Sequence, residues 1–320
     1  MRRFAVPLAV CAALGLAAVP LSSAQAAEVA PATTGTTTAA HSPAGALAST
    51  TAAPAAASAN DISGWTETTS YLEGTLGAGE GVATVDPPGG SAYELYRGTT
   101  SIPVGLAVAG WTHVGDPDSA NGYIVDAYQN SSASAGTKMF LVTTPSGATH
   151  QYVHALVPGE LYNNSFDAIS PDSQWMVAGE WGTMDHLQVY PTPLLNPATS
   201  ATGGSLALSG SINLDHRVND VQGCDFVTAT KLICASDDSS ETLFPNAKPL
   251  LEVDLSAPLA NGSVDGTVTD LGSIPQSSIC SGTFEAEGVD YDPGTGILRV
   301  QIIQPSVCEV VTSVIEYKQS

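Results

Sequence analysis

Three oxygen-bearing side chains recur at one offset of a degenerate internal repeat, and a fourth lies two residues after the last of them. These four are the residues of this chain best suited to chemistry. They are Asn164, Asp220, Glu285 and Glu287. Ca²⁺ prefers carboxylate and amide oxygens and takes about six to eight of them. A bound Ca²⁺ polarises a lactone carbonyl or a phosphoryl oxygen, so these residues predict a calcium site that could support hydrolysis. The alternative is that they end strands and cap turns at the mouth of a water-filled channel.

The repeat that relates these residues also predicts the fold. Its three copies span residues 166–180, 222–236 and 287–301, and each reads as a strand, a tight turn and a second strand. When Ala168, Cys224 and Val289 are aligned, the copies are 56 and 65 residues apart. This is roughly the length of one four-stranded propeller blade with long loops. Equivalent strands of successive blades start at the same end of a propeller, so matching offsets are expected to converge at the channel.

The remaining folded sequence reads as all-β. Runs rich in Val, Ile, Thr and aromatic residues alternate with clusters of Gly, Pro, Asn and Asp, without a helical period. At about 40 to 55 residues per blade, the chain is expected to form a single β-propeller of about five to seven four-stranded blades. The expected strands include residues 81–85, 93–96, 102–112, 122–128, 138–143, 150–155, 175–179 and 186–190.

Two segments precede the expected propeller. Residues 1–26 combine Arg2 and Arg3 with an apolar run and a small-residue exit, which is typical of a secretory signal peptide. Residues 27–60 consist almost entirely of Ala, Thr, Ser, Pro and Gly, and they predict a disordered leader or propeptide. We therefore expect a propeller domain over residues 61–320 in a secreted, extracellular, monomeric protein that does not span a membrane.

The charge balance excludes some classes of partner. Without the signal peptide the chain has seven Lys and Arg (9 less Arg2 and Arg3) against 31 Asp and Glu, a formal net charge of −24. Nucleic acids and anionic membranes require basic surface for binding, so neither is expected as a partner. The acidity fits calcium binding, a basic protein partner, or an exported protein kept soluble by its charge.

Four cysteines follow the signal peptide, and four cysteines allow three pairings. Cys224 and Cys234 flank an expected hairpin, which favours a bond between them. Cys280 and Cys308 are then expected to pair within the last blade. The spacings contain no short zinc knuckle.

Motifs for nucleophilic catalysis are missing from the sequence. There is no G-x-S-x-G elbow. His150 and His154 share a strand face, and we expect two exposed histidines rather than a metal pair. Asp116 and Asp118 lie in the run Gly-Asp-Pro-Asp-Ser-Ala-Asn-Gly, where ordinary turn chemistry is expected over a calcium loop. Trp181 falls in an expected loop and could anchor a protein partner.

Two resemblances bear on function. The run from Phe284 to Pro293 resembles the E-x-E-G-x-x-x-x-P segment of secreted propellers that include lactonase-like and phytase-like proteins. In architecture, export and size the chain resembles the family of exported bacterial propellers that contains the dispase autolysis-inducing protein. That resemblance implies binding to a thermolysin-type metalloprotease and promotion of its autolysis. It also implies cross-linking by a transglutaminase, for which Gln129 and Gln319 are the candidate acceptors.

The sequence therefore predicts a non-enzymatic binding propeller, because no complete catalytic set accompanies the candidate metal residues. The alternative function is a calcium-dependent hydrolase of the lactonase or phosphoesterase type that acts in the propeller channel. A surface or matrix protein without a specific ligand is the third reading.

Overall fold

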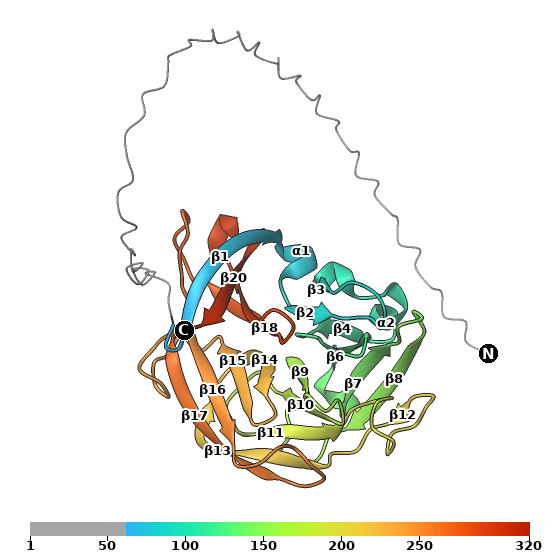
Figure 1. The fold of residues 1–320 in the computed structure, drawn as a ribbon. Coiled ribbons are helices and arrows are strands. Elements are labelled where there is room, and N and C mark those ends of the chain that lie inside the picture. Colours follow the sequence, from blue (N-terminus) through green and yellow to red (C-terminus); the bar gives the residue numbers. More distant parts are fainter. Residues whose placement is uncertain (1–61) are drawn as a thin grey trace, which may run out of the picture. The chain divides into compact units, whose positions relative to one another are not determined.

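Mostly antiparallel sheets arranged as blades around a central channel make up residues 62–320, the part of the chain that the computed structural model describes (Figure 1). The outer strands of two neighbouring blades, β13 (Gly210–Val218) and β17 (Val264–Ser273), pair in parallel. The predicted signal peptide and leader lie outside the described residues. The strand-rich composition and the frequent turn residues thus produce the all-β propeller that the repeat predicts.

Three blades have the expected four antiparallel strands. The strands of each blade are named below from the innermost strand, which lines the channel, to the outermost one. Blade 3 consists of β9 (Phe166–Ile169), β10 (Trp175–Gly179), β11 (Met184–Pro191) and β13 (Gly210–Val218). Blade 4 consists of β14 (Val221–Thr228), β15 (Lys231–Ser236), β16 (Pro249–Leu255) and β17 (Val264–Ser273). Blade 5 consists of β18 (Glu285–Asp292), β19 (Ile297–Ile303), β20 (Val311–Gln319) and β1 (Trp65–Gly74).

The other two blades depart from this plan. Blade 1 has only β2 (Gly81–Val85) and β3 (Tyr93–Arg97), preceded by α1 (Thr75–Ala78) and followed by η1 (Thr99–Ser101) and α2 (Val104–Val108). Blade 2 has an interrupted inner strand, β4 (Trp111–Val114) and β5 (Asp118–Ala120), which both pair with β6 (Tyr123–Asn130). It continues through η2 (Ala133–Ala135), β7 (Thr137–Thr143) and β8 (Thr149–Ala155), and the short β12 (Gly204–Ser205) joins its outer edge.

The ring contains five blades. The inner strands β2, β5, β9, β14 and β18 contact one another in that order, and β18 contacts β2. The first described strand, β1, pairs along its whole length with β20 near the C-terminus, so the two ends of the domain share blade 5 (Figure 1). The number of blades falls within the expected range, although blade 1 is two-stranded.

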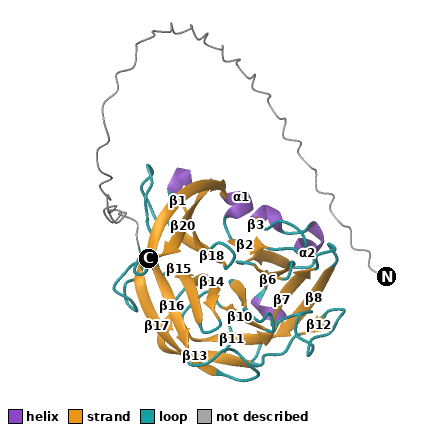
Figure 2. Ribbon diagram, in the orientation of Figure 1, coloured by secondary structure: helices purple, strands orange, loops and turns teal. Residues whose placement is uncertain are grey.

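One expected strand is wrong. The segment 102–112 contains the single-turn helix α2 and only the start of β4. Pro103, with φ −58°, precedes the helix, and Gly110, with φ 97°, follows it. The intervening residues are small or apolar enough to accept either conformation, so the local pattern did not separate a helical turn from a strand. Figure 2 shows that the helices are short pieces within connections.

Apolar cores lie between neighbouring blades. Separate clusters join blades 1 and 2, blades 2 and 3, blades 3 and 4, and blades 4 and 5. Where blade 5 meets blade 1, charged groups make the contact instead. Arg299 donates to Asp290 at 2.7 Å and to Glu316 at 3.0 Å, and its side chain lies 3.1 Å from Glu94 of β3.

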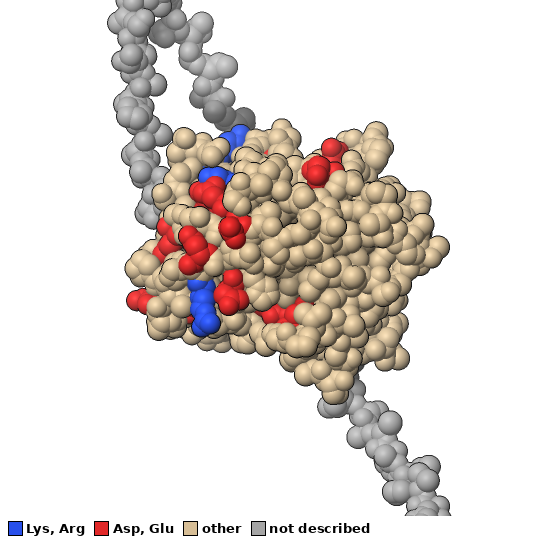
Figure 3. All heavy atoms as spheres, turned by 90° about the horizontal axis from the view of Figure 1, so that it is seen from below, with Lys and Arg blue, Asp and Glu red and all other residues tan. Residues whose placement is uncertain are grey.

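Much of the negative charge lies inside the ring. On the side shown in Figure 3, charged side chains gather toward one edge and most of the face is uncharged. The buried acidic residues are Asp116, Asp118, Asp126, Asp167, Glu180, Asp225, Asp238, Glu287, Asp290 and Asp292. Burying a carboxyl group is costly unless it gains partners, so solubility alone does not account for the acidity of this chain.

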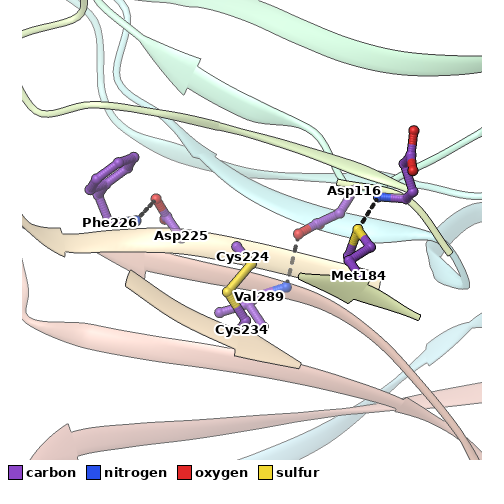
Figure 4. Close-up of a disulfide and its surroundings, with 8 residues drawn as sticks. Asp116, Met184, Cys224, Asp225, Phe226, Cys234 and Val289 are labelled. Carbon is purple, nitrogen blue, oxygen red and sulfur yellow. Dashed lines mark hydrogen bonds between the residues drawn. A yellow bond between two sulfur atoms is a disulfide. The ribbon is translucent and has the colours of Figure 1, made fainter. Parts of the chain in front are cut away.

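Both expected disulfides are confirmed. Cys224 and Cys234 face each other on β14 and β15, with Cα atoms 4.0 Å apart, and they form a bond (Figure 4). Cys280 bonds to Cys308 and connects the segment before β18 with η3 (Ser306–Cys308). The second bond therefore holds two connections of blade 5 together.

Candidate functional site

The channel has two chemically different ends. We call the face at which the inner strands begin the top face, and the face at which they end the bottom face. Because strands alternate in direction within a blade, the connections between blades and those between second and third strands lie at the top. The turns between first and second strands lie at the bottom.

Near the bottom end, three aspartates join neighbouring inner strands. Asp118 accepts a hydrogen bond from the Ile169 amide at 2.5 Å, and Asp225 accepts one from the Tyr291 amide at 2.6 Å. Asp290 accepts from the Thr84 amide at 2.6 Å. Each carboxyl group thus satisfies a backbone donor of the next blade around the ring.

These hydrogen bonds show that the three repeat copies align differently from the alignment of Ala168, Cys224 and Val289 expected from the sequence. Ile169 and Tyr291 hold the same position, since each donates to the aspartate of the preceding blade. Ala168 is therefore equivalent to Asp225 and Asp290, not to Cys224 and Val289. A one-residue shift moves a side chain to the opposite face of a strand, so the matching offsets drawn from the first copy do not hold.

The Asp116 side chain also joins two inner strands, closer to the top face than Asp118, Asp225 and Asp290. Its carboxylate accepts hydrogen bonds from Val82 of β2 at 2.9 Å and from Val289 of β18 at 3.0 Å (Figure 4). A Cβ at Gly223 or Gly288 would approach its oxygens to 2.3 and 2.4 Å, so both positions need glycine. Asp116 therefore fills the narrow part of the channel.

The turn expected around Asp116 and Asp118 is thus wrong for both aspartates. Both are buried in the channel, because blade 2 places its inner strand there. Only the Asn121–Gly122 step forms a turn, with φ of 53° and 75°.

The candidate calcium residues divide between two places. Asp220, Glu285 and Glu287 belong to one acidic group at the top mouth of the channel, together with Asp237 and Glu80, in which neighbouring carboxyl groups repel one another. Asn164 is fully buried, and its amide donates to the Met139 carbonyl of β7 at 3.4 Å.

The electrostatics of the top mouth are unfavourable for bare carboxylates. Burial, and then repulsion from Glu285, raises the pKa of Glu80 to about 8. Burial, followed by repulsion from Glu80, Glu285 and Asp237, raises the pKa of Glu287 well above its ordinary value. Lys248 is bound to Asp237, which accepts a further bond from the Ala286 amide at 2.7 Å. The mouth is therefore a site where a cation would be stabilised.

Within residues 62–320, no group of three or more His, Cys, Asp or Glu side chains is arranged to hold a metal ion. The calcium site stays a prediction. Sequence reasoning found Glu285 and Glu287 through the repeat, but it missed Glu80 and Asp237. Neither lies at a repeated offset, and only the fold brings them to the mouth.

At the bottom face the channel widens into a cavity of about 1020 Å³. Asp118, Asp225 and Asp290 line it, and Phe226 and Tyr291 contribute aromatic surface. Burial raises the pKa of all three aspartates, and repulsion from Asp290 adds to the effect on the other two, bringing Asp118 to about 7. The sequence contained a signal for these aspartates, since an aspartate directly follows both Cys224 and Val289 in the aligned repeat.

The exposed large apolar side chains are concentrated on the top face. Trp181 is 50% exposed in the connection between β10 and β11, and Val108 of α2 is 85% exposed. The directions of the adjoining strands place every exposed large apolar residue of the described chain except Tyr93 at the top face. The top-face residues are Leu72, Leu76, Val104, Val108, Val157, Leu161, Trp181, Ile279, Val307 and Val310.

The candidate transglutaminase acceptors both lie in strands. Gln129 is partly buried in β6 opposite Lys138. Gln319 is exposed at the end of β20, opposite Trp65 of β1. Their role as acceptors stays a prediction.

A second buried ionic cluster lies between blades 2 and 3. Lys138 is fully buried and lies 2.5 Å from Glu180 and 3.5 Å from Glu160. His154 contacts Glu160 at 2.8 Å and is 3% exposed, so the expectation that it is an exposed histidine is wrong. The contact with Glu160, which follows β8 in the chain, holds the imidazole inside. This cluster is an interior ion-pair network that connects two blades.

Comparisons with known proteins add little beyond the fold. No family model matches the sequence, and no curated protein matches it. Similar solved structures include a gluconolactonase, XC5397 from Xanthomonas campestris, at 10% identity and a TM-score of 0.35, covering 64% of this chain and 57% of that one. They also include the Cps50 (Swd1) β-propeller domain of Myceliophteria thermophila, at 9% identity and 0.32, covering 72% and 61%.

A third similar structure is Hsv2 of Kluyvelomyces marxianus, at 11% identity and a TM-score of 0.32, covering 64% of this chain and 60% of that one. The chain thus spans about three-fifths of the length of each of these proteins. Likenesses this remote do not bear on activity or site. Separately, none of the helices within residues 62–320 has the length and apolar character needed to cross a bilayer.

Proposed function

We propose that this protein is a secreted, non-enzymatic β-propeller that docks another extracellular protein on its top face. The observation that carries the proposal is the concentration of exposed large apolar side chains on that face, with Tyr93 as the exception. Single exposed apolar residues are ordinary on protein surfaces, but their gathering at one face is typical of a protein interaction site. Trp181 is the aromatic anchor of this face.

The proposal favours binding over catalysis on chemical grounds. The hydrogen-bonded histidines of the described chain, His154, His186 and His216, contact carboxylates or backbone carbonyls. None of these contacts activates a hydroxyl or thiol nucleophile. Four channel aspartates are occupied in holding neighbouring inner strands together, which is a structural task. They are Asp116, Asp118, Asp225 and Asp290.

A thermolysin-type metalloprotease is the partner we propose, in line with the resemblance in architecture, size and export. Binding would place the protease against the top face and promote its autolysis. The proposal predicts that purified thermolysin binds the propeller in biolayer interferometry and is degraded faster in its presence, as seen on denaturing gels.

Variants of the face give the test its specificity. Trp181→Ala and the double variant Val104→Ser/Val108→Ser are expected to weaken binding, whereas Tyr93→Ser on the bottom face leaves it unchanged. If the wild-type propeller neither binds thermolysin nor alters its degradation, the protease proposal fails. If binding persists in the top-face variants, the face is wrongly assigned.

One observation favours the second candidate function, a calcium-dependent hydrolase of the lactonase or phosphoesterase type. Glu287 is 4% exposed, and among residues 62–320 the groups that act on its carboxyl are other carboxyls, which repel it. A bound Ca²⁺ would stabilise it. Thermal unfolding with Ca²⁺ and with EDTA tests this candidate, because a specific site raises Tm in the wild type and not in Glu287→Gln. Equal Tm values in the two conditions would remove it.

A further inference from the structure

We propose that the top mouth of the channel binds the guanidinium group of an arginine that the docked protein inserts. The inference rests on the proposed docking function and names the chemistry of the partner. It follows from a path of carboxyl groups leading inward, from a buried acceptor without a donor beside its end, and from the exposed apolar residues near it.

The carboxyl groups form a gradient of burial. Glu285 is exposed at the start of β18, the Glu80 side chain is 17% exposed, and Glu287 is 4% exposed. Each repels its neighbours, since Glu285 acts on Glu80, and both act on Glu287. A cation that enters between these carboxylates is attracted by Glu285 at the rim. The attraction is stronger at the buried Glu287, where less water screens the two charges.

The buried end of this path holds an acceptor that lacks a donor, next to a carboxyl group that only like charges surround. Glu287 is 4% exposed, and the groups that act on its carboxyl are other carboxyls, which repel it. Gln301 is fully buried, and its Oε1 accepts no hydrogen bond, although its amide donates to the Ala78 carbonyl at 3.1 Å. This Oε1 lies beside Gly288, the residue after Glu287, at 2.8 Å from where a Cβ would stand. Buried acceptors without donors are costly, and a ligand with N–H groups would satisfy them.

The arrangement suits an organic cation better than a metal ion. Within residues 62–320 no three carboxyl, thiol or imidazole groups are disposed around a common point for a metal. A guanidinium group instead presents about five N–H donors in a planar fork, so it can reach oxygens that are spread apart. Lys248, a lysine at the mouth, is held by Asp237 and is not among the groups that act on Glu287.

The surrounding rim fits the same partner. The Thr75 amide donates to the Val310 carbonyl at 3.1 Å, so Leu76 of α1 and Val310, each 68% exposed, belong to neighbouring segments of the top face. An arginine has a long aliphatic stem beneath its charged group. Apolar contacts at the rim and charge at the centre would therefore act on the same inserted side chain.

Binding should release protons, which adds a signature to the test. In the free protein the pKa of Glu287 is raised, whereas a bound guanidinium favours the carboxylate, so affinity increases as pH rises toward about 8, where Glu80 ionises. The groups that face Glu287 or its neighbours are Glu80, Glu285, Asp237, Asp116, Lys248 and His113.

The experiment uses a blocked Ala-Arg-Ala peptide as the probe and the matching peptide with citrulline as its neutral control. Titration into the isotopically labelled full chain, followed by NMR, is expected to shift amide signals of residues 285–288 in a saturable way with arginine only. Glu287→Gln should weaken the affinity about tenfold or more. Asp86→Asn, which removes a charge from the bottom face, should leave it unchanged.

Three outcomes overturn the proposal: no saturable shift at the mouth, equal binding of arginine and citrulline, or equal affinity in Glu287→Gln. Because the probe is a peptide, this test does not depend on thermolysin. Loss of thermolysin binding with intact probe binding refutes the docking function alone, and the reverse result refutes the arginine site alone. Displacement of the probe by Ca²⁺ at stoichiometric concentration would assign the mouth to a metal instead.

Discussion

Glu80→Gln should make this protein more stable at alkaline pH. Burial and repulsion from Glu285 raise the pKa of Glu80 from 4.5 to about 8. The nearest base, His113, lies 3.6 Å away, but burial lowers its pKa, so it is neutral where Glu80 ionises. A raised carboxyl pKa means that folding is favoured while Glu80 is protonated. Its contribution is full below pH 4.5 and is lost as the pH rises through about 8.

The size of the effect follows from the two pKa values. The interval between 4.5 and about 8 corresponds to at most about 5 kcal/mol, since each pKa unit is worth about 1.4 kcal/mol. The Glu80 side chain is 17% exposed and keeps some water, which reduces the effect toward about 2 kcal/mol. Glutamine has a similar shape and no charge to bury, so it removes this penalty at high pH.

Urea unfolding at a series of values between about pH 5 and about pH 9 measures the difference. The free energy of unfolding of the wild type is expected to fall relative to Glu80→Gln by about 2 to 4 kcal/mol over this range. Glu241→Gln removes the same charge from an exposed loop and should run parallel to the wild type. Parallel curves for Glu80→Gln as well would refute the reasoning about the top mouth.

Three further changes test how the blades are held together. Lys138→Met leaves Glu180 and Glu160 buried without their cation and should cost about 3 to 5 kcal/mol in urea unfolding, whereas Lys231→Met, at a surface pair, should cost less than about 1 kcal/mol. Asp290→Ala removes acceptors for Thr84 and Arg299 and should cost about 3 to 5 kcal/mol by the same measurement; a cost under about 1 kcal/mol would contradict its role between blades 5 and 1. Cys280→Ser/Cys308→Ser opens a loop of 28 residues and should lower the stability by about 3 to 4 kcal/mol, and an unchanged midpoint of thermal unfolding would contradict this.

The candidate site was only partly accessible to sequence reasoning. The repeat led to Glu285 and Glu287 because inner strands share a direction and a starting face. It misplaced Asn164, since the first copy is shifted by one residue relative to the other two. That shift became visible only in the hydrogen bonds from Ile169 and Tyr291 to aspartates of the preceding blades. Which residues of neighbouring blades lie at the same height depends on contacts between residues far apart in the sequence. The local pattern of residues therefore does not specify this alignment.

Local pattern by itself determined the all-β class, most strand positions and the Cys224–Cys234 pair, because alternation and turn residues act over a few neighbouring positions. Only the tertiary structure decided which polar residues are buried. Asp116 read as part of a surface turn, yet ring closure places it in the channel between β2 and β18. His154 read as exposed, yet Glu160 holds it inside. Glu80 and Asp237 meet Glu287 at the top mouth only because the ring brings strands that are distant in sequence to one axis.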